Sequence, residues 1–228
     1  MNLLRSTFLY GSLTFGLISA VTAQTADDLA LLKKMNDADL AAPASRMTST
    51  VTDRDSGAVL ETIVVEQVKP DQVHFLTTQY GKPGTEMISD GKRSLERSGP
   101  NEPWKALPMN LSEMMKKMHN SGVGEDQMRE QHARLKLIGD DKVGGVAAHV
   151  YEISGDTGPS KIWLATDDSR LLKLERDYDG TGPIATPKFD GTLKSLKAQL
   201  KAATTQRHLH SVTTCEYDPS IKITMPPQ

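Results

Sequence analysis

The sequence predicts a mainly β protein of the α+β kind, with an antiparallel sheet, one helix before it and helical insertions along it. Three observations predict this class. From residue 46 onward, short segments rich in Thr and Val repeat with a period of two. Clusters of Gly, Asp and Pro separate these segments, and such short turns connect antiparallel neighbours. Two longer stretches, residues 99–131 and 181–207, interrupt the alternation with helical patterns.

Residues 1–23 have the composition of a cleaved signal peptide. Arg5 precedes an apolar run over residues 8–18, and small residues lead to Ala23. The run is too short to span a bilayer, which needs about 20 apolar residues. We therefore predict cleavage after Ala23, export to the periplasm, and a single soluble domain over residues 24–228.

Composition argues against two classes of protein. The formal net charge is −2 and charges of both signs are scattered along the chain, so no nucleic-acid-binding surface is expected. Cys215 is the single cysteine, so no disulfide can form within the chain. We interpret Cys215 as a buried apolar residue and not as a reactive thiol, because no neighbouring base in the sequence would activate it.

The first half of the chain predicts one helix followed by strands. Residues 25–39 form the helix, because Leu29 and Leu32 recur at helical spacing after two aspartates. Asp90-Gly91 is a strong hairpin signal between the last two strands of this half. The predicted strands are residues 46–53, 59–68, 72–79, 86–89 and 93–97.

The stretch after these strands predicts a helical insertion rich in methionine. Asn110 is placed as an N-cap, and Glu113 completes a capping box with it. Methionine suits irregular gaps and adaptable apolar surfaces, so the cluster is either core filler or the lining of a ligand site. Its members are Met109, Met114, Met115 and Met118.

The second half returns to strands and contains a second insertion. Residues 139–142 are predicted as a turn between the first two strands of this half. Residues 190–203 predict a basic amphipathic helix, in which a leucine stripe lies beside Lys194, Lys197 and Lys201. The predicted strands are residues 135–138, 146–153, 161–165, 171–178, 210–217 and 221–225.

The sequence contains no catalytic or metal-binding motif with specific spacing. His208 and His210 would leave one face of a strand, but Cys215 falls on the opposite face, so surface histidines are favoured. Asp177 opens a segment resembling a calcium loop, yet its twelfth position is Lys188, so a turn is favoured. We therefore predict a non-enzymatic protein without a cofactor or metal.

Four segments carry a family resemblance. They are Val68–Phe75, with a Lys-Pro entry into a strand, Ile88–Lys92, with an Asp-Gly-Lys hairpin, Lys161–Asp167, and Tyr217–Ile223. These segments resemble the periplasmic lipoprotein-carrier superfamily, the LolA/LolB-like outer membrane lipoprotein-sorting proteins. The likeness spans about residues 25–225. His74 stands where the family usually has arginine, and the helix at residues 190–203 is an insertion that the carriers lack.

The resemblance implies a half-open antiparallel β-barrel whose concave face is covered by helices and shelters a lipid or a lipidated protein. Such a protein is non-catalytic and monomeric, and it can carry its cargo between membranes. An alternative is a sensory or interaction domain with a packed core, which docks a membrane-associated partner or a membrane surface through the basic helix. The residues that alternation directs into the cavity are Val65, Phe75, Met115, Met118, Tyr151, Ile153, Trp163 and Leu174.

Overall fold

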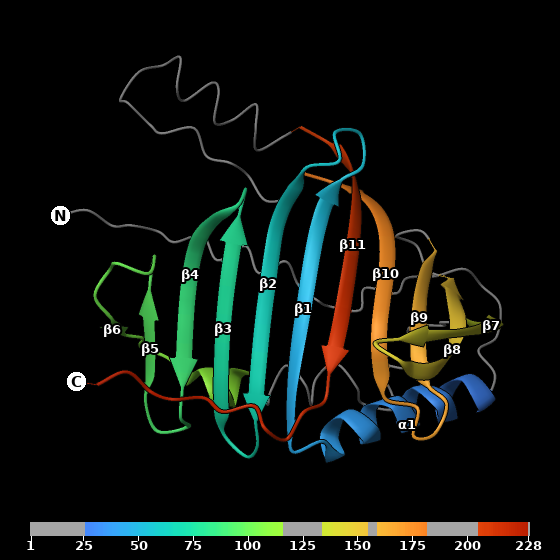
Figure 1. Ribbon diagram of the computed structural model, residues 1–228, viewed down its shortest axis with the longest axis horizontal. Coiled ribbons are helices and arrows are strands. Elements are labelled where there is room, and N and C mark those ends of the chain that lie inside the picture. The colour runs from blue at the N-terminus through green and yellow to red at the C-terminus, as the bar shows by residue number, and fades with distance from the viewer. Residues whose placement is uncertain (1–25, 116–133, 155–158, 182–204, 228) are drawn as a thin grey trace.

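A computed structural model of the chain describes residues 26–115, 134–154, 159–181 and 205–227 (Figure 1). Within these residues the chain forms one 11-stranded sheet, and every paired neighbour in it is antiparallel. The edge strands β6 and β7 do not pair with each other in the described part of the chain, so the sheet stays open. The predicted fold class is therefore confirmed.

One helix precedes the strands, and a short helical segment interrupts them. The helix α1 is Ala26–Ala41, and residues 111–115 are helical. The strands are β1 (Ala44–Asp53), β2 (Val59–Val68), β3 (Gln72–Gln79), β4 (Lys82–Ser89), β5 (Ser94–Arg97), β6 (Lys105–Ala106), β7 (Arg134–Val143), β8 (Val146–Ser154), β9 (Ser160–Ala165), β10 (Leu171–Gly180) and β11 (Arg207–Glu216).

The sheet consists of two meanders that meet in its middle. Its strand order is β6-β5-β4-β3-β2-β1-β11-β10-β9-β8-β7, so β1 to β6 advance to one edge and β7 to β11 return from the other. The central joint between β1 and β11 runs from Arg46 opposite Glu216 to Asp53 opposite Leu209. Residues 107–115 follow β6 and place Leu107 and Leu111 against β2 to β4.

Two predicted turns lie inside strands. The turn predicted at residues 139–142 is wrong, because β7 continues through it and the hairpin turns at Gly144-Gly145, with φ of +57° and +86°. Glycine is the residue that adopts this left-handed conformation without strain. The turn favoured at Asp177 is also wrong, because β10 runs on to Gly180, which pairs with Arg207.

The C-terminal segment is not the strand predicted at residues 221–225. It follows β11 and runs along the ends of the strands without a ladder partner (Figure 1). The alternating residues Ile221 and Ile223 are buried, with exposed fractions of 7% and 8%. The two-residue pattern therefore reflects burial of one side of an extended segment. Residues 1–23 and the helix predicted at 190–203 lie outside the described residues.

Helix α1 confirms its prediction and is fixed at both ends by polar contacts. At its start, Asp28 Oδ1 accepts a hydrogen bond of 3.3 Å from the backbone N–H of Leu135 in β7. At its end, Lys69 Nζ donates to the carbonyl oxygens of Asp39, at 2.7 Å, and Leu40. A cation at a helix C-terminus satisfies carbonyls that lack an intrahelical partner. Burial lowers the pKa of Lys69. None of the described helices has the length and apolar character needed to cross a bilayer.

Candidate functional site

Alternation divides the sheet into two faces with different coverings. We call the face that contacts α1 and residues 111–115 the helix-covered face, and the opposite one the outer face. On the outer face, β7 runs across β8 and β9 (Figure 1). The candidate ligand site is the helix-covered face, because the large apolar side chains of β2 to β4 and of β8 to β10 gather there.

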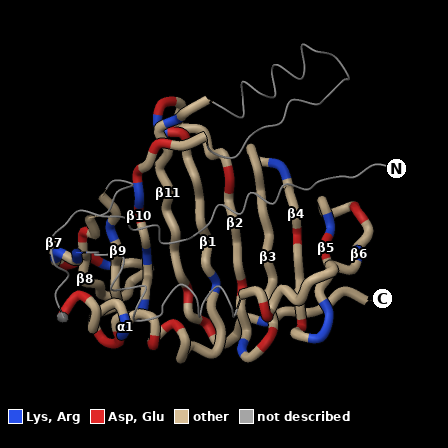
Figure 2. The backbone as a smooth tube through the Cα atoms, turned by 180° about the vertical axis from the view of Figure 1, so that it is seen from behind, with Lys and Arg blue, Asp and Glu red and all other residues tan. Residues whose placement is uncertain are grey.

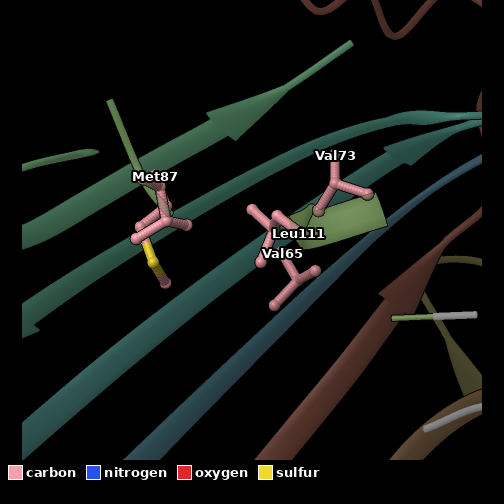
Figure 3. Close-up of a cluster of buried hydrophobic side chains, with 5 residues drawn as sticks. Val65, Val73, Met87 and Leu111 are labelled. Carbon is pink, nitrogen blue, oxygen red and sulfur yellow. The ribbon is translucent and has the colours of Figure 1, made fainter. Parts of the chain in front are cut away.

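The first group on the helix-covered face, the β2–β4 cluster, is built by strand register (Figure 3). Val65 of β2 lies opposite Phe75 of β3, which lies opposite Met87 of β4. Leu111 packs onto these strands and is only 1% exposed. The buried members are Val65, Val73, Met87, Leu107 and Leu111, and the half-buried side chains around them are Met47, Ile63, Phe75, Met114 and Met115.

The second group, the β8–β10 cluster, lies under α1 on the other side of the sheet's midline. Ile162 of β9 is opposite both Tyr151 of β8 and Leu174 of β10. Leu31 and Met35 of α1 pack against these strands. Its buried members are Ile153, Ile162 and Leu164, and its half-buried members include Leu135, Tyr151, Leu171 and Leu174.

A strip of small side chains on β1 and β11 separates the two clusters. Ser49 and Thr213 face each other there and are 6% and 2% exposed, and Thr213 Oγ1 donates a hydrogen bond of 3.1 Å to Ser49 Oγ. Cys215 continues the strip opposite Met47. Desolvation raises the pKa of the Cys215 thiol to about 12, so the group is protonated at neutral pH and is a poor nucleophile.

Buried hydroxyl groups anchor the start of the short helix to the β4–β5 hairpin. Ser112 Oγ donates to the carbonyl oxygen of Asp71, and it lies 2.9 Å from Ser89 Oγ. Ser94 Oγ lies 3.0 Å from Ser89 Oγ and accepts the backbone N–H of Leu111 at 3.0 Å. Because buried polar groups are costly unless paired, this network fixes where Leu111 enters the β2–β4 cluster.

Asn110 is the N-cap that the sequence predicts. Its Oδ1 accepts the backbone N–H of Glu113 at 3.1 Å, and its Nδ2 donates to the carbonyl oxygen of Gly91 at 2.8 Å. Gly91 has a φ of +84°, and a Cβ at this position would lie 2.5 Å from Cβ of Asp71. The cap and the hairpin turn therefore depend on each other.

The structure distributes the predicted cavity residues over both clusters. Val65, Phe75 and Met115 come together in the β2–β4 cluster. Tyr151, Ile153 and Leu174 come together in the β8–β10 cluster. Met118 lies outside the described residues. Whether any of these side chains contacts a ligand stays a prediction.

Trp163 is on the outer face, which corrects its predicted orientation. It lies opposite Val150, whereas its neighbour Ile162 lies opposite Tyr151 on the helix-covered face. Its indole N–H donates to Asp141 Oδ2 at 3.0 Å, under the β7–β8 hairpin. Both faces of β9 are covered, so burial of an aromatic residue there does not indicate which face it occupies.

Sequence reasoning missed several members of the β2–β4 cluster. Val73 and Met87 share the alternation of Val65 and Phe75, so strict use of the two-residue period would have found them. No alternating pattern points to Leu107, because it follows the two-residue strand β6 and lies outside any strand. It joins the cluster only because the chain turns back onto the sheet after β6.

The outer face of the first meander carries a row of ionic contacts across neighbouring strands. Arg46 Nη2 lies 2.7 Å from Glu66 Oε1, and Glu66 Oε2 lies 3.0 Å from His74 Nδ1. His74 Nε2 lies 2.9 Å from Glu86 Oε1, and Glu86 Oε2 lies 2.6 Å from Arg97 Nη2. Each residue comes from a different strand, so the row links the five strands β1 to β5 of the first meander.

The two histidines of β11 pair with aspartates of β10. His208 Nδ1 lies 2.6 Å from Asp179 Oδ1, and His210 Nδ1 lies 2.8 Å from Asp177 Oδ1. The hydrogen bond with Asp179 raises the pKa of His208. Among the described residues, no group of three or more His, Cys, Asp or Glu side chains is arranged to hold a metal ion.

Comparison with known proteins finds similarity only at the level of structure. No protein-family model and no curated protein matches the sequence. LprF from Mycobacterium bovis is similar, with a TM-score of 0.50 and 13% identity over 90% of this chain and 99% of LprF. The Mycobacterium tuberculosis lipoprotein LppX gives a TM-score of 0.49 and 16% identity over 82% and 92% of the two chains. A LolA superfamily protein from Nitrosomonas europaea gives 0.27 and 11% over 86% and 92%.

At these sequence identities the similarity concerns the fold alone. Of the three structures, only LprF reaches a TM-score of 0.50. The open antiparallel sheet, the N-terminal helix and the helical segment on the same face are the parts that the sequence resemblance implied. The chain thus shares the fold of LprF.

Proposed function

We propose that this protein binds a lipid, or the acyl chains of a lipidated protein, on the helix-covered face of its sheet. The single observation that carries the proposal is the border of the β2–β4 cluster. There, five large apolar side chains are only half-buried: Met47, Ile63, Phe75, Met114 and Met115. Large apolar side chains that are left half-buried around one cluster are expected at ligand grooves.

The energetics of such binding are favourable. Each methylene group removed from water contributes about 0.8 kcal/mol, so a chain of about fifteen carbons contributes roughly 12 kcal/mol before the cost of association. Methionines at the border suit cargo of variable shape, because their side chains are flexible and polarizable. The proposed role is non-catalytic, and export to the periplasm follows from the signal-peptide pattern of residues 1–23. More specifically, we propose that the protein carries the bound lipid or lipidated protein between membranes.

Native mass spectrometry of gently purified protein tests the proposal directly. We expect co-purified lipid, and we expect a fluorescent fatty acid to bind saturably to delipidated protein. Phe75→Asn places an amide at the cluster border, so affinity should fall about tenfold or more. Leu76→Asn is the matched control, because Leu76 is the next residue of β3 and faces the outer side. It should leave affinity unchanged.

Two results would count against lipid binding. One is protein that purifies empty and takes up no fatty acid. The other is equal loss of affinity in Phe75→Asn and Leu76→Asn. If reversal of charge at Lys194, Lys197 and Lys201 abolished cellular function while Phe75→Asn preserved it, the interaction-domain alternative would replace the proposal.

A further inference from the structure

A pocket of about 610 Å³ lies at the β5–β6 edge of the sheet, away from the β8–β10 cluster. Apolar side chains form much of its wall, including Leu95, Trp104, Leu107 and Met109. Met109 is 44% exposed, which is high for a large apolar residue. Its size suits one small molecule, because pockets for such ligands measure about 300–1,000 Å³.

The charges around this pocket are of one sign. Lys92 and Arg93 line it, and none of the described residues that line it is Asp or Glu, although the whole chain has a net charge of −2. Figure 2 shows the basic turn between β4 and β5 beside the C-terminal segment, and Pro227 of that segment also lines the pocket.

The carboxylate of Asp90, beside Lys92 and Arg93 in the same turn, is already engaged by the turn itself. Asp90 Oδ1 accepts the backbone N–H groups of Lys92, at 3.0 Å, and Arg93, at 2.9 Å. Its Oδ2 reaches Arg93 Nε only at 3.6 Å. No ion pair involves Lys92 in the described part of the structure. An anionic ligand group could therefore pair with Lys92 and Arg93, because the carboxylate of Asp90 contacts the Arg93 guanidinium only at 3.6 Å.

The contrast with the second pocket supports this assignment of charge. That pocket, of about 370 Å³, lies at the β10–β11 end and mixes cations with acids. Arg54 Nη1 lies 3.2 Å from Asp177 there, and His208 pairs with Asp179. Its charges pair at 2.6 to 3.2 Å within the protein, whereas in the β5–β6 pocket Arg93 reaches Asp90 only at 3.6 Å and Lys92 has no ion pair among the described residues.

We propose that the β5–β6 pocket binds a single-chain anionic amphiphile, with its acidic group at Lys92 and Arg93 and its hydrocarbon chain against Trp104, Leu95 and Met109. The stacked guanidinium of Arg97, whose carbon lies 4.6 Å from the centre of the Trp104 ring, holds the indole in place. This inference does not depend on ligand binding at the helix-covered face.

Tryptophan fluorescence tests the inference in the full mature chain. The chain has two tryptophans, so Trp163→Phe leaves Trp104 as the only reporter. A brominated long-chain fatty acid should quench Trp104 saturably. In the reciprocal variant Trp104→Phe, Trp163 should not be quenched, and this second measurement holds even if Trp163→Phe folds poorly.

Charge reversal identifies the head-group site. Lys92→Glu with Arg93→Glu should weaken quenching of Trp104 about tenfold or more. Lys136→Glu with Lys142→Glu is the matched control, because both lysines are exposed on β7 at the opposite edge of the sheet, and it should change nothing. A brominated fatty alcohol should also bind more weakly than the acid.

Three outcomes would overturn the inference. Quenching that survives the Lys92 and Arg93 reversal would remove the head-group site. Quenching that is lost in Phe75→Asn and kept in the reversal would mean that the chain reaches Trp104 from the helix-covered face, which leaves the proposed function intact. Quenching by brominated anionic vesicles without quenching by the free fatty acid would make the pocket a membrane-docking site instead.

Discussion

The two faces of the first meander are built from neighbouring residues, yet they differ in kind. On the outer face, Glu66, His74 and Glu86 satisfy one another and their flanking arginines by hydrogen bonds of about 3 Å or less. On the helix-covered face, Val65, Phe75 and Met87 occupy the adjacent positions of the same strands and pack in one apolar cluster with Leu111.

This difference indicates that the outer face specifies the strand register, whereas the helix-covered face is available to a ligand. A slip of one residue in any of these strands would carry a charged side chain into the apolar cluster. The ionic row therefore fixes register, and its own surface needs no further partner. The apolar face is stabilised by burial against any apolar partner, whether this is one of the protein's own helices or the hydrocarbon chain of a ligand. Single substitutions at adjacent residues can test this division.

Met87→Ala should produce the largest loss of stability. Met87 is 1% exposed, and truncation of a buried methionine costs about 2–5 kcal/mol because it leaves a cavity. Urea denaturation followed by circular dichroism would measure the change in the free energy of unfolding. A loss below about 1 kcal/mol would mean that the helix-covered face relaxes around the gap, as a loosely packed face would.

Glu86→Gln, at the adjacent position, should cost less, about 1 kcal/mol. The carboxylate contacts His74 and Arg97, but all three side chains are partly exposed, at 16% to 23%, so water screens the interaction. The same urea measurement applies. If Glu86→Gln lowered the free energy of unfolding as much as Met87→Ala, the ionic row would contribute as much stability as the apolar cluster, and its role would not be limited to fixing the strand register.

The sequence was sufficient for strands whose pattern and turns agree. β2 and β3 begin and end where predicted because Thr- and Val-rich segments are bounded there by Asp, Gly and Pro. Asn110 was found as a cap for a similar reason, since a capping signal is local in sequence. The pairing of β1 with β11 was not predictable, because it joins residues that lie 156 positions apart (Asp53 and Leu209) to 170 positions apart (Arg46 and Glu216), and such a distant pairing leaves no local pattern in the sequence.

The candidate site was predictable only where one face of a strand is covered. On β2 and β3 the polar residues Glu66 and His74, next in sequence to Val65 and Phe75, mark the other face, so alternation gave the correct side. On β9 the alternation is lost, because Ile162, Trp163 and Leu164 are all buried, and Trp163 was assigned to the wrong face. The contribution of Leu107 and Leu111 depends on the path of the chain between distant edges.

Lowering the pH should expose the contribution of Glu66 to the outer row. Burial acts to raise the pKa of Glu66, but hydrogen bonds from His74 and Arg46 outweigh it and lower the pKa below its usual 4.5. A carboxyl group whose pKa is lowered in the folded state stabilises the protein at pH values above its pKa in the unfolded state. This stabilisation is lost as the pH falls through the pKa of the folded state.

The stability difference between the wild type and Glu66→Gln should therefore shrink as the pH falls below about 4.5. Urea denaturation at a series of pH values would measure it for both proteins. Other acids with lowered pKa values, such as Asp90 and Asp141, are common to both and cancel in the difference. A constant difference across this range would show that Glu66 acts through packing and not through its charge.

Glu216→Gln should have the smallest effect, because it removes only an exposed contact between Arg46, at the end of the row, and β11. Glu216 Oε2 lies 3.3 Å from Arg46 Nη1, and the two side chains are 63% and 41% exposed. Exposed ion pairs contribute about 0–1 kcal/mol and weaken with salt, so the change should lie within about 0.5 kcal/mol and vanish at high salt. A larger loss that persisted in salt would mean that the row continues across the β1–β11 joint, and that the ionic contacts help to hold the two meanders together. In that case the outer face would determine the union of the meanders as well as the register within the first of them.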